Sequence, residues 1–366
     1  MKAKKLELRN FRNYLQEELS FGDGINILHG DNAQGKTNIL EAVYLFSMGK
    51  ANRARRDAEL IRHEEDTASL ALDFFDGERD NRTEINLFKN RPKTVTVNEV
   101  PIRKNSELMG RFRVVYFGPE YLGLVKEGPK ARRRNLDILI SQLRPRYFAS
   151  LSDVKKLTES KNALLKMEKP NLAMLDVLNE KLATKSAEII SYRAEYIAKI
   201  AAFATELQKE ISGGNELLEI RYDCCVHDCQ GLEVSALQEK VYQKLEESRK
   251  RELDCRESVV GPHREDMTYL INGQEAKLFA SSGQQKTVVL VQKLAEVALM
   301  EKETGDLPVL LLDDIMSELD KKRQSFILNH IRDMQILITC TDVDGFDLTG
   351  DARLFQVEKG AVTSQT

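Results

Sequence analysis

The chain has 366 residues, of which 42% are hydrophobic, and its formal net charge is −3 at pH 7. This length predicts two domains, or one domain with a large insertion, and the apolar content is sufficient for a substantial core. The charge excludes a protein that coats nucleic acid through bulk charge, and the absence of any run of 18 apolar residues excludes a membrane-spanning helix. Met1-Lys-Ala-Lys-Lys leads into an alternating strand instead of a signal-peptide core, so we expect a cytoplasmic protein.

The first elements along the chain are predicted to be strands. Apolar and polar residues alternate in the first eleven positions, and the apolar run Ile25–Leu28 follows a glycine turn. Residues 69–102 alternate again between polar turns, which predicts antiparallel strands. Val114–Phe117, ended by Gly118-Pro119, closes this β-rich part of the chain.

A phosphate-binding loop is predicted between the run Ile25–Leu28 and a helix over Asn38–Met48. Its glycines allow backbone N–H groups to point at phosphates, and the helix adds its positive N-terminal end. Lys36 can reach the β and γ phosphates, and Thr37 can reach a magnesium ion. A glycine-rich turn before a surface helix is the alternative, which the flanking strand and helix disfavour. The residues expected at the nucleotide are Gly30, Asp31, Asn32, Ala33, Gln34, Gly35, Lys36, Thr37 and Asn38.

From about Gly128 the composition shifts to long helices. Apolar residues from Leu175 to Ile211 recur at spacings of three, four and seven before a stop at Gly213-Gly214, which predicts an amphipathic helix of roughly 35 residues. A strand, a charged helix and a second strand are expected after it, over Leu217–Tyr222, Val234–Arg251 and Met267–Ile271.

The five cysteines do not form a disulfide framework, and they fit a reducing compartment. Cys224, Cys225, His227 and Cys229 lie close together, so a metal site has to be weighed. The cluster lacks a second ligand pair at zinc-finger spacing, and the end of a strand carrying buried thiols is the favoured interpretation.

Two adjacent carboxylates follow the continuous apolar run Val309–Leu312, which is typical of a strand buried in a parallel sheet. At the carboxyl end of such a strand they are expected beside the phosphate loop. Asp313 would hold magnesium and Asp314 would orient the attacking water, so that Asp314, Lys36 and Asp313 form the predicted catalytic set. An acidic turn after a core strand is the alternative.

A second anion site is predicted at Ala280–Thr287, where a Ser/Gly turn begins an apolar-periodic helix. A single chain seldom uses two phosphate-binding helix ends on one triphosphate. This segment therefore indicates a second subunit.

These segments resemble ABC-type ATPases. Ala280-Ser281-Ser282-Gly283-Gln284 is similar to their signature motif, and Ser317-Glu318-Leu319-Asp320 is similar to their D-loop. About 275 residues separate the phosphate loop from the acidic strand, as in the SMC-like branch, but no coiled coil of hundreds of residues intervenes. Within that branch the chain resembles the bacterial RecF family of recombination mediators. The further segments that carry this resemblance are Asn10–Tyr14, Gly30–Ala42, Arg55–Arg62, Arg132–Asp137, Gly261–Asp266 and Leu311–Asp314.

The resemblance implies an α/β fold, an ABC-type (SMC-like) ATPase head with a mixed sheet and a helical arm inserted between its halves. The expected parts are residues 1–118 and 255–366 for the head and 119–254 for the arm. It also implies a homodimer in which two heads join head to tail around ATP and Mg²⁺. Lys36 and Thr37 of one subunit would then face Ser281 and Gly283 of the other, with Asp320 crossing the interface. Gln284 belongs to the same expected nucleotide-binding set.

The chain departs from the ABC pattern at two positions. Asp314 stands where Glu is usual, and the position of the switch histidine falls near Thr341. A shorter carboxylate lies farther from the water it must align, and threonine cannot act as a cation, so slow hydrolysis is expected. No obvious Q-loop glutamine appears, and Glu120 is a weak substitute.

Basic residues concentrate in two segments, and charged runs of this kind are commonly solvated faces. The resemblance favours contact with DNA phosphates instead, and implies recognition of double-stranded DNA beside single-strand gaps, cooperation with RecR and RecO, help in loading RecA, and a link to SOS induction. An ATP-dependent nuclease or motor, and an SMC-type structural ATPase, are the alternatives. A transporter ATPase subunit is excluded by the motif spacing. The basic residues are Arg53, Arg55, Arg56, Arg62, Lys126, Lys130, Arg132, Arg133, Arg134, Arg144 and Arg146.

Overall fold

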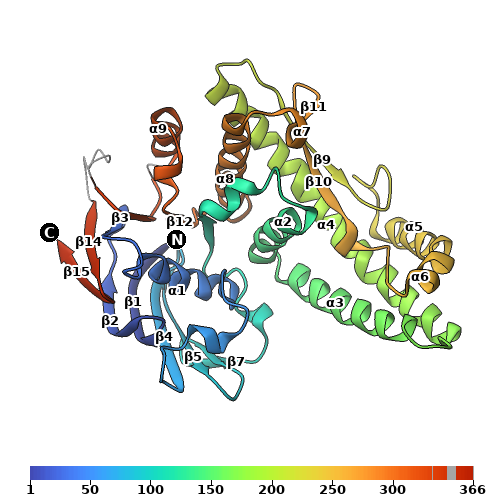
Figure 1. Cartoon of the computed structure of the whole chain (residues 1–366), viewed down its shortest axis with the longest axis horizontal. Coiled ribbons are helices and arrows are strands. Elements are labelled where there is room, and N and C mark those ends of the chain that lie inside the picture. The colour runs from blue at the N-terminus through green and yellow to red at the C-terminus, as the bar shows by residue number, and fades with distance from the viewer. Residues whose placement is uncertain (332, 344–351, 366) are drawn as a thin grey trace. The chain divides into compact units, whose positions relative to one another are not determined.

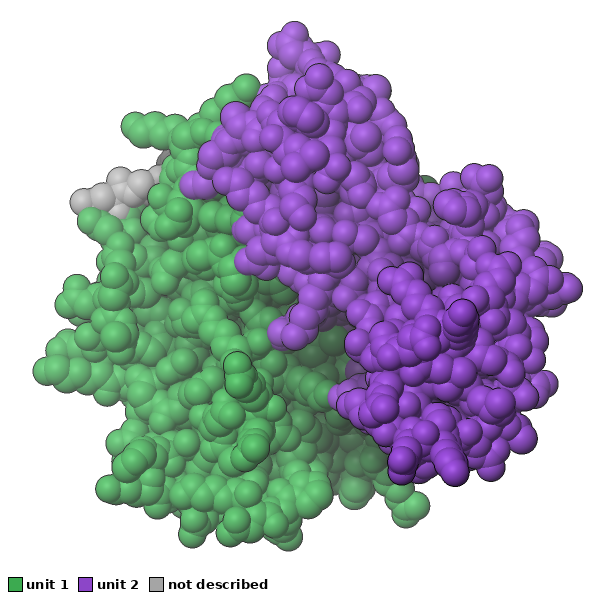
Figure 2. All heavy atoms as spheres, turned by 45° about the vertical axis from the view of Figure 1, so that its right-hand side comes forward, with its two compact units in different colours: residues 1–122, 296–366 green, residues 123–295 purple. Residues whose placement is uncertain are grey.

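The computed structural model describes residues 1–331, 333–343 and 352–365. The chain divides into two compact units, which Figure 2 colours separately: unit 1 comprises Met1–Leu122 and Glu296–Thr366, and unit 2 comprises Gly123–Ala295. The breaks at 122/123 and 295/296 differ from the predicted boundaries, because residues 255–295 pack with the helical part. In the described parts of the chain, no helix has the length and apolar character needed to cross a membrane.

Unit 1 contains a six-stranded antiparallel sheet with the order β2-β1-β4-β5-β6-β7. Leu8 pairs with Leu70, which pairs with Ile85, which pairs with Val95, and all four are buried. The predicted alternation therefore places one face of this sheet in the core. The strands are β1 (Lys2–Phe11), β2 (Tyr14–Ser20), β4 (Thr67–Phe75), β5 (Asp80–Phe88), β6 (Thr94–Val97) and β7 (Val100–Ile102).

A second six-stranded sheet of unit 1 has the order β15-β14-β3-β13-β12-β8, and only β15 is antiparallel to its neighbour (Figure 1). The strand Val114–Phe117 belongs here, beside β12, and not to the antiparallel sheet that precedes it in the chain. Its four residues are all buried, as expected in a parallel sheet. The strands are β3 (Ile25–His29), β8 (Val114–Phe117), β12 (Val309–Asp313), β13 (Ile336–Cys340), β14 (Arg353–Glu358) and β15 (Ala361–Gln365).

Two helices of unit 1 carry motifs from the sequence. Helix α1 (Lys36–Met48) begins directly after the phosphate loop and ends at Gly49, whose left-handed backbone lets its N–H bond to Leu45 O at 2.8 Å. Helix α9 (Lys321–His330) begins at Asp320, whose side chain accepts a hydrogen bond from the N–H of Arg323. Helix α8 (Ser282–Thr304) runs across the boundary between the units.

Unit 2 is mainly helical. Its longest helix, α4, has 41 residues, begins at the cap Asn171 and ends at Gly213 in the left-handed region, so the predicted amphipathic helix is confirmed and longer than expected. The predicted single helix over 234–251 is wrong, because the chain breaks at Ser248 into α5 and α6. The remaining described elements of unit 2 include a three-stranded sheet, β11-β10-β9, and the helices α2, α3 and α7. Their bounds are α2 (Pro129–Leu143), α3 (Pro145–Leu165), α4 (Leu172–Ser212), α5 (Val234–Glu247), α6 (Arg249–Cys255), α7 (Ala276–Phe279), β9 (Leu218–Asp223), β10 (Asp266–Ile271) and β11 (Gln274–Glu275).

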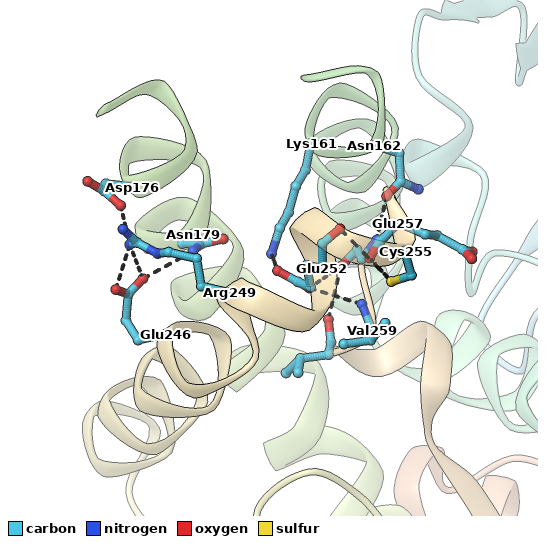
Figure 3. A network of polar contacts seen from close by, with 12 residues as sticks. Lys161, Asn162, Asp176, Asn179, Glu246, Arg249, Glu252, Cys255, Glu257 and Val259 are labelled. Carbon is cyan, nitrogen blue, oxygen red and sulfur yellow. Dashed lines mark hydrogen bonds and ion pairs between the residues drawn. The ribbon is translucent and has the colours of Figure 1, made fainter. Parts of the chain in front are cut away.

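A polar network joins the helices of unit 2 (Figure 3). Lys161 of α3 and Glu252 of α6 form an ion pair of 2.7 Å with both side chains fully buried. The other carboxylate oxygen of Glu252 accepts from the N–H of Val259 at 2.9 Å. Arg249 bonds Glu246 of α5 and Asp176 of α4. These contacts tie α6 to α3, α4 and α5.

Candidate functional site

The phosphate loop runs from β3 to α1 through backbone conformations that require glycine. Gly30 and Gly35 have φ values of 140° and 118°. A side chain at Gly35 would place its Cβ 2.5 Å from Asn13 Nδ2 and 2.7 Å from the hydroxyl of Tyr14. Glycine at position 35 therefore lets the loop pack closely against these side chains, while residues 31–33 in the middle of the loop are exposed.

A hairpin between β1 and β2 supports this loop. Asn13 Nδ2 donates to Gln34 O at 2.8 Å, and the Tyr14 hydroxyl donates to Gly35 O at 3.0 Å. Asn38 Nδ2 donates to Asn13 Oδ1 at 2.8 Å, which joins the hairpin to α1. The segment Asn10–Tyr14 entered the sequence analysis only as part of a resemblance, and the structure assigns it this supporting role.

Lys36 closes the mouth of the loop. Its Nζ donates to Gly30 O at 2.6 Å and to Asp31 O at 3.0 Å, and the residue is 4% exposed. The cation, the loop backbone and the N-terminus of α1 all favour negative charge at the same place. This combination suits a polyphosphate.

The carboxylate of Asp313 lies at the centre of the site. Its Oδ1 accepts hydrogen bonds from the hydroxyls of Thr37 at 2.7 Å and Thr339 at 2.9 Å. Its Oδ2 accepts from the Tyr116 hydroxyl at 2.7 Å and from Arg53 at 2.9 Å. The structure thus brings the predicted pair Thr37 and Asp313 together, and adds three partners that sequence reasoning did not place there.

Asp314 follows in a strained conformation, with φ of 49°, and its N–H donates to the Thr339 hydroxyl at 2.8 Å. Burial raises the pKa of the Asp314 carboxyl above its usual range, and the neighbouring charge of Asp313 raises that pKa further. The two adjacent acids therefore occupy different environments: Asp313 is fully hydrogen-bonded, while Asp314 is partly desolvated.

The oxygen donors of this site fit a small hard cation. Mg²⁺ is commonly bound by one or two protein oxygens together with phosphates of a substrate. Thr37 and Asp313 provide such oxygens beside the phosphate loop. Over the ranges that the structure describes, no group of three or more His, Cys, Asp or Glu side chains is arranged to hold a metal by itself, and this includes the cluster around Cys224.

The segment that resembles a signature motif lies in unit 2, at the start of α8. Ser281 and Gln284 bond reciprocally: Ser281 N–H donates to Gln284 Oε1 at 2.8 Å, and Gln284 N–H donates to Ser281 Oγ at 3.2 Å. Gln285 Nε2 donates to Ala280 O at 3.0 Å and holds the preceding turn. Leu278 and Phe279, directly before it, are 66% and 68% exposed, unusual values for large apolar side chains.

Three weaker candidates lie in unit 1. Glu120 accepts from Asn52 Nδ2 at 2.7 Å and lies 3.7 Å from Arg53. Thr341 is exposed just after β13. Asp320 caps α9. None of these contacts assigns a catalytic role.

Several predicted DNA-contacting arginines bond within their own unit. Arg132 is 4% exposed and makes a bidentate ion pair with Asp266, with both distances 2.7 Å. Arg133 donates to Glu265 O at 2.5 Å, and Arg62 donates to Asn13 O at 2.5 Å. The basic residues of the two segments that are exposed include Arg55, Arg56, Lys126, Lys130, Arg134 and Arg146.

Comparison with known proteins gives consistent likenesses. The family RecF/RecN/SMC N terminal domain matches residues 2–361. Proteins named "DNA replication and repair protein RecF" are similar to this chain: one from Clostridium perfringens is 38% identical over 366 residues, covering 99% of both chains, and one from Alkaliphilus oremlandii is 40% identical over 364 residues, covering 99% and 100%.

Solved structures of the same family are similar to this chain as well. One, described as "the recombination mediator protein RecF-ATPrS in RecFOR pathway", is 36% identical, covers 100% of this chain and 98% of its own, and has a TM-score of 0.94. An Smc head at 15% identity and a TM-score of 0.55 shares the fold alone. These likenesses confirm the predicted fold class, an SMC-like ATPase head with a mixed sheet and an additional helical part.

Proposed function

This chain belongs to the RecF family of DNA replication and repair proteins, and we propose that it is an ATP-dependent DNA-binding protein of recombinational repair. The observation that carries the nucleotide part is the contact of the Thr37 hydroxyl with Asp313 beside a glycine loop closed by Lys36. ATP is the proposed ligand because solved RecF relatives are described with ATP and ATPrS.

Within this proposal Lys36 binds the β and γ phosphates, and Thr37 and Asp313 hold Mg²⁺. The ion would neutralise phosphate charge and orient the γ phosphate. Asp314 would orient the attacking water. Because its carboxylate is one methylene shorter than the glutamate usual in ABC ATPases, hydrolysis is expected to be slow. Turnover of tens per second on DNA would contradict this.

We place the second half of the nucleotide site on a partner subunit. Ser281, Gly283 and Gln284 resemble a signature motif, and the reciprocal bonds of Ser281 and Gln284 hold its turn in a defined conformation. The exposed side chains of Leu278 and Phe279 support an interface here, since apolar residues this exposed beside an ordered turn favour burial by a partner. The proposed dimer is head to tail, forms with ATP, and has Asp320 crossing the interface.

The proposed DNA ligand is a duplex beside a single-strand gap. The exposed basic residues around positions 55 and 130 would contact phosphates, so binding would be sequence-tolerant and salt-dependent. Because ATP would form the dimer that binds DNA, ATP binding would be coupled to DNA binding. ATP hydrolysis would then return the protein to the state that does not retain DNA. Cooperation with RecR and RecO, loading of RecA, a link to SOS induction and a cytoplasmic location complete the proposal, supported by the RecFOR description of the solved relative.

The test is the mass of the protein in solution without nucleotide, with ATP and with ADP, each with and without a gapped duplex. Lys36→Met removes the phosphate cation, and Ser281→Arg blocks the signature turn. We expect a dimer that retains DNA with ATP only, and loss of both properties in both variants. A mass that never changes, with DNA binding indifferent to ATP, would reject the two-headed arrangement.

A further inference from the structure

Thr339 lies between the two halves of the nucleotide site within unit 1. Strand β13 is hydrogen-bonded to β3, which leads into the phosphate loop, on one side and to β12, which carries the acids, on the other. Thr339 is in register with Leu28 on the first strand and with Asp313 on the second, and it is 0% exposed. The strand order therefore places this residue between the strand that leads into the loop and the strand that carries the acids, a position that sequence reasoning did not assign to it.

The hydroxyl of Thr339 contacts both acids. It donates its one proton to Asp313 Oδ1 at 2.9 Å, and its oxygen accepts the N–H of Asp314 at 2.8 Å. The second contact secures the residue at which the backbone leaves β12 in a left-handed conformation, φ 49°. One side chain thus orients a carboxylate and fixes the start of the turn that carries the next one.

The other partners of Asp313 do not duplicate this role. Thr37 shares Oδ1 but is the residue expected to reach the cation. Tyr116 and Arg53 bond Oδ2. Of the four side chains that bond Asp313 within the described residues, Thr339 alone also bonds Asp314.

We propose that Thr339 is a positioning residue for ATP hydrolysis, which keeps Asp313 aligned with Thr37 and holds the backbone of Asp314 in place. This inference rests on the proposed function. The contrary interpretation is that Thr339 is a β-branched residue filling the sheet, in which case valine, with the same shape, would replace it without effect.

The test compares Thr339→Val, which removes both contacts, with Thr339→Ser, which keeps the hydroxyl. Tyr116→Phe is the matched control, because it removes one hydroxyl from the same carboxylate without touching Asp314. The readouts are the hydrolysis rate constant at saturating ATP, the Mg²⁺ concentration at half-maximal rate, and nucleotide binding without Mg²⁺.

For Thr339→Val we expect a rate constant reduced about 10- to 100-fold and a raised Mg²⁺ requirement, with Mg²⁺-free nucleotide binding unchanged, since partners that orient metal-binding carboxylates have effects of this size. Thr339→Ser should restore both values, and Tyr116→Phe should raise the Mg²⁺ requirement with a smaller effect on the saturating rate.

Wild-type kinetics in Thr339→Val, or failure of serine to restore them, would overturn the inference. If the valine variant does not fold, Thr339→Cys keeps the approximate volume with a weak hydrogen-bonding group, and wild-type kinetics in that variant would have the same meaning. Absence of ATP hydrolysis in the wild type would instead reject the proposed function.

Discussion

The hydroxyl of Thr37 donates to the carboxylate of Asp313 over 2.7 Å, although 276 positions separate the two residues in the chain. This contact joins the start of α1 to the end of β12 at the phosphate loop. Both groups carry oxygen atoms suited to Mg²⁺. We therefore expect ATP hydrolysis to depend on both side chains.

Thr37→Val and Asp313→Asn should each reduce Mg²⁺-dependent ATP hydrolysis at least about 100-fold, because each removes or neutralises an oxygen expected at the ion. Nucleotide binding without Mg²⁺ should change little. Thr304→Val is the control, since its hydroxyl donates to Met300 O within α8. If either site variant hydrolysed ATP at the rate of the control, the assignment of Mg²⁺ to Thr37 and Asp313 would be wrong.

Phe279→Asp should weaken ATP-dependent dimerisation at least about tenfold, because a charge would replace an apolar side chain expected in the interface. The measurement is the dimer fraction against protein concentration with ATP. Val100→Asp is matched to it, since Val100 is 64% exposed and lies on an edge strand of the antiparallel sheet. Equal dimerisation of the two variants would exclude Phe279 from the interface.

Arg132 and Lys130 are close in the chain, but Arg132 is buried and Lys130 is exposed, so we expect them to have different roles. Arg132→Ala should lower the free energy of unfolding by about 3–5 kcal/mol, because it leaves Asp266 without its bidentate partner. Lys130→Ala should leave stability unchanged and, if Lys130 contacts a phosphate, lower the salt dependence of DNA binding by about one ion. Denaturant titration and binding at several salt concentrations separate the two. A stable Arg132→Ala protein would contradict the structural role.

The buried pair of Lys161 and Glu252 gives a double-mutant test. Lys161→Met should destabilise the protein by about 3–5 kcal/mol, because the Glu252 charge remains buried without its cation. Adding Glu252→Gln removes that charge, retains an oxygen to accept from the N–H of Val259, and should recover part of the loss. Additive effects of the two substitutions in unfolding experiments would show that the charges do not interact.

His263 predicts a pH dependence of stability. Burial lowers the pKa of its imidazole below the ordinary value of 6.5, and the charges of Arg264 and Arg133 act in the same direction. In the unfolded chain His263 therefore becomes protonated near pH 6.5, whereas in the folded chain it becomes protonated only at a lower pH. Stability from this group is present above pH 6.5 and is lost as pH falls, by at most about 1.4 kcal/mol per pH unit.

The measurement is the free energy of unfolding between pH 7.5 and the acid limit of reversible unfolding, for wild type and His263→Gln. The variant should show a shallower decline over the first unit below pH 6.5. Identical slopes would indicate that His263 titrates alike in both states.

Features encoded in contiguous residues were predictable. The alternation of β1, β4 and β5, the phosphate loop and the long helix α4 with its glycine end all follow from local spacing and backbone preference. Each depends on neighbours within a few positions. The break of α5 from α6 at Ser248 was missed, because the residues around it have no proline or glycine that would mark it. The contacts of α6, such as that of Glu252 with Lys161, involve residues distant in the chain.

The residues alone were enough to predict the motifs of the nucleotide site, the helical composition of the middle of the chain and the family to which the chain is similar. The folded chain was needed to show that β8 joins the parallel sheet, that β13 carries Thr339 between the phosphate loop and the acids, and that Arg132 is an internal ion-pair partner. Strand order and the burial of charge depend on contacts between residues distant in the chain, which local periodicity does not encode.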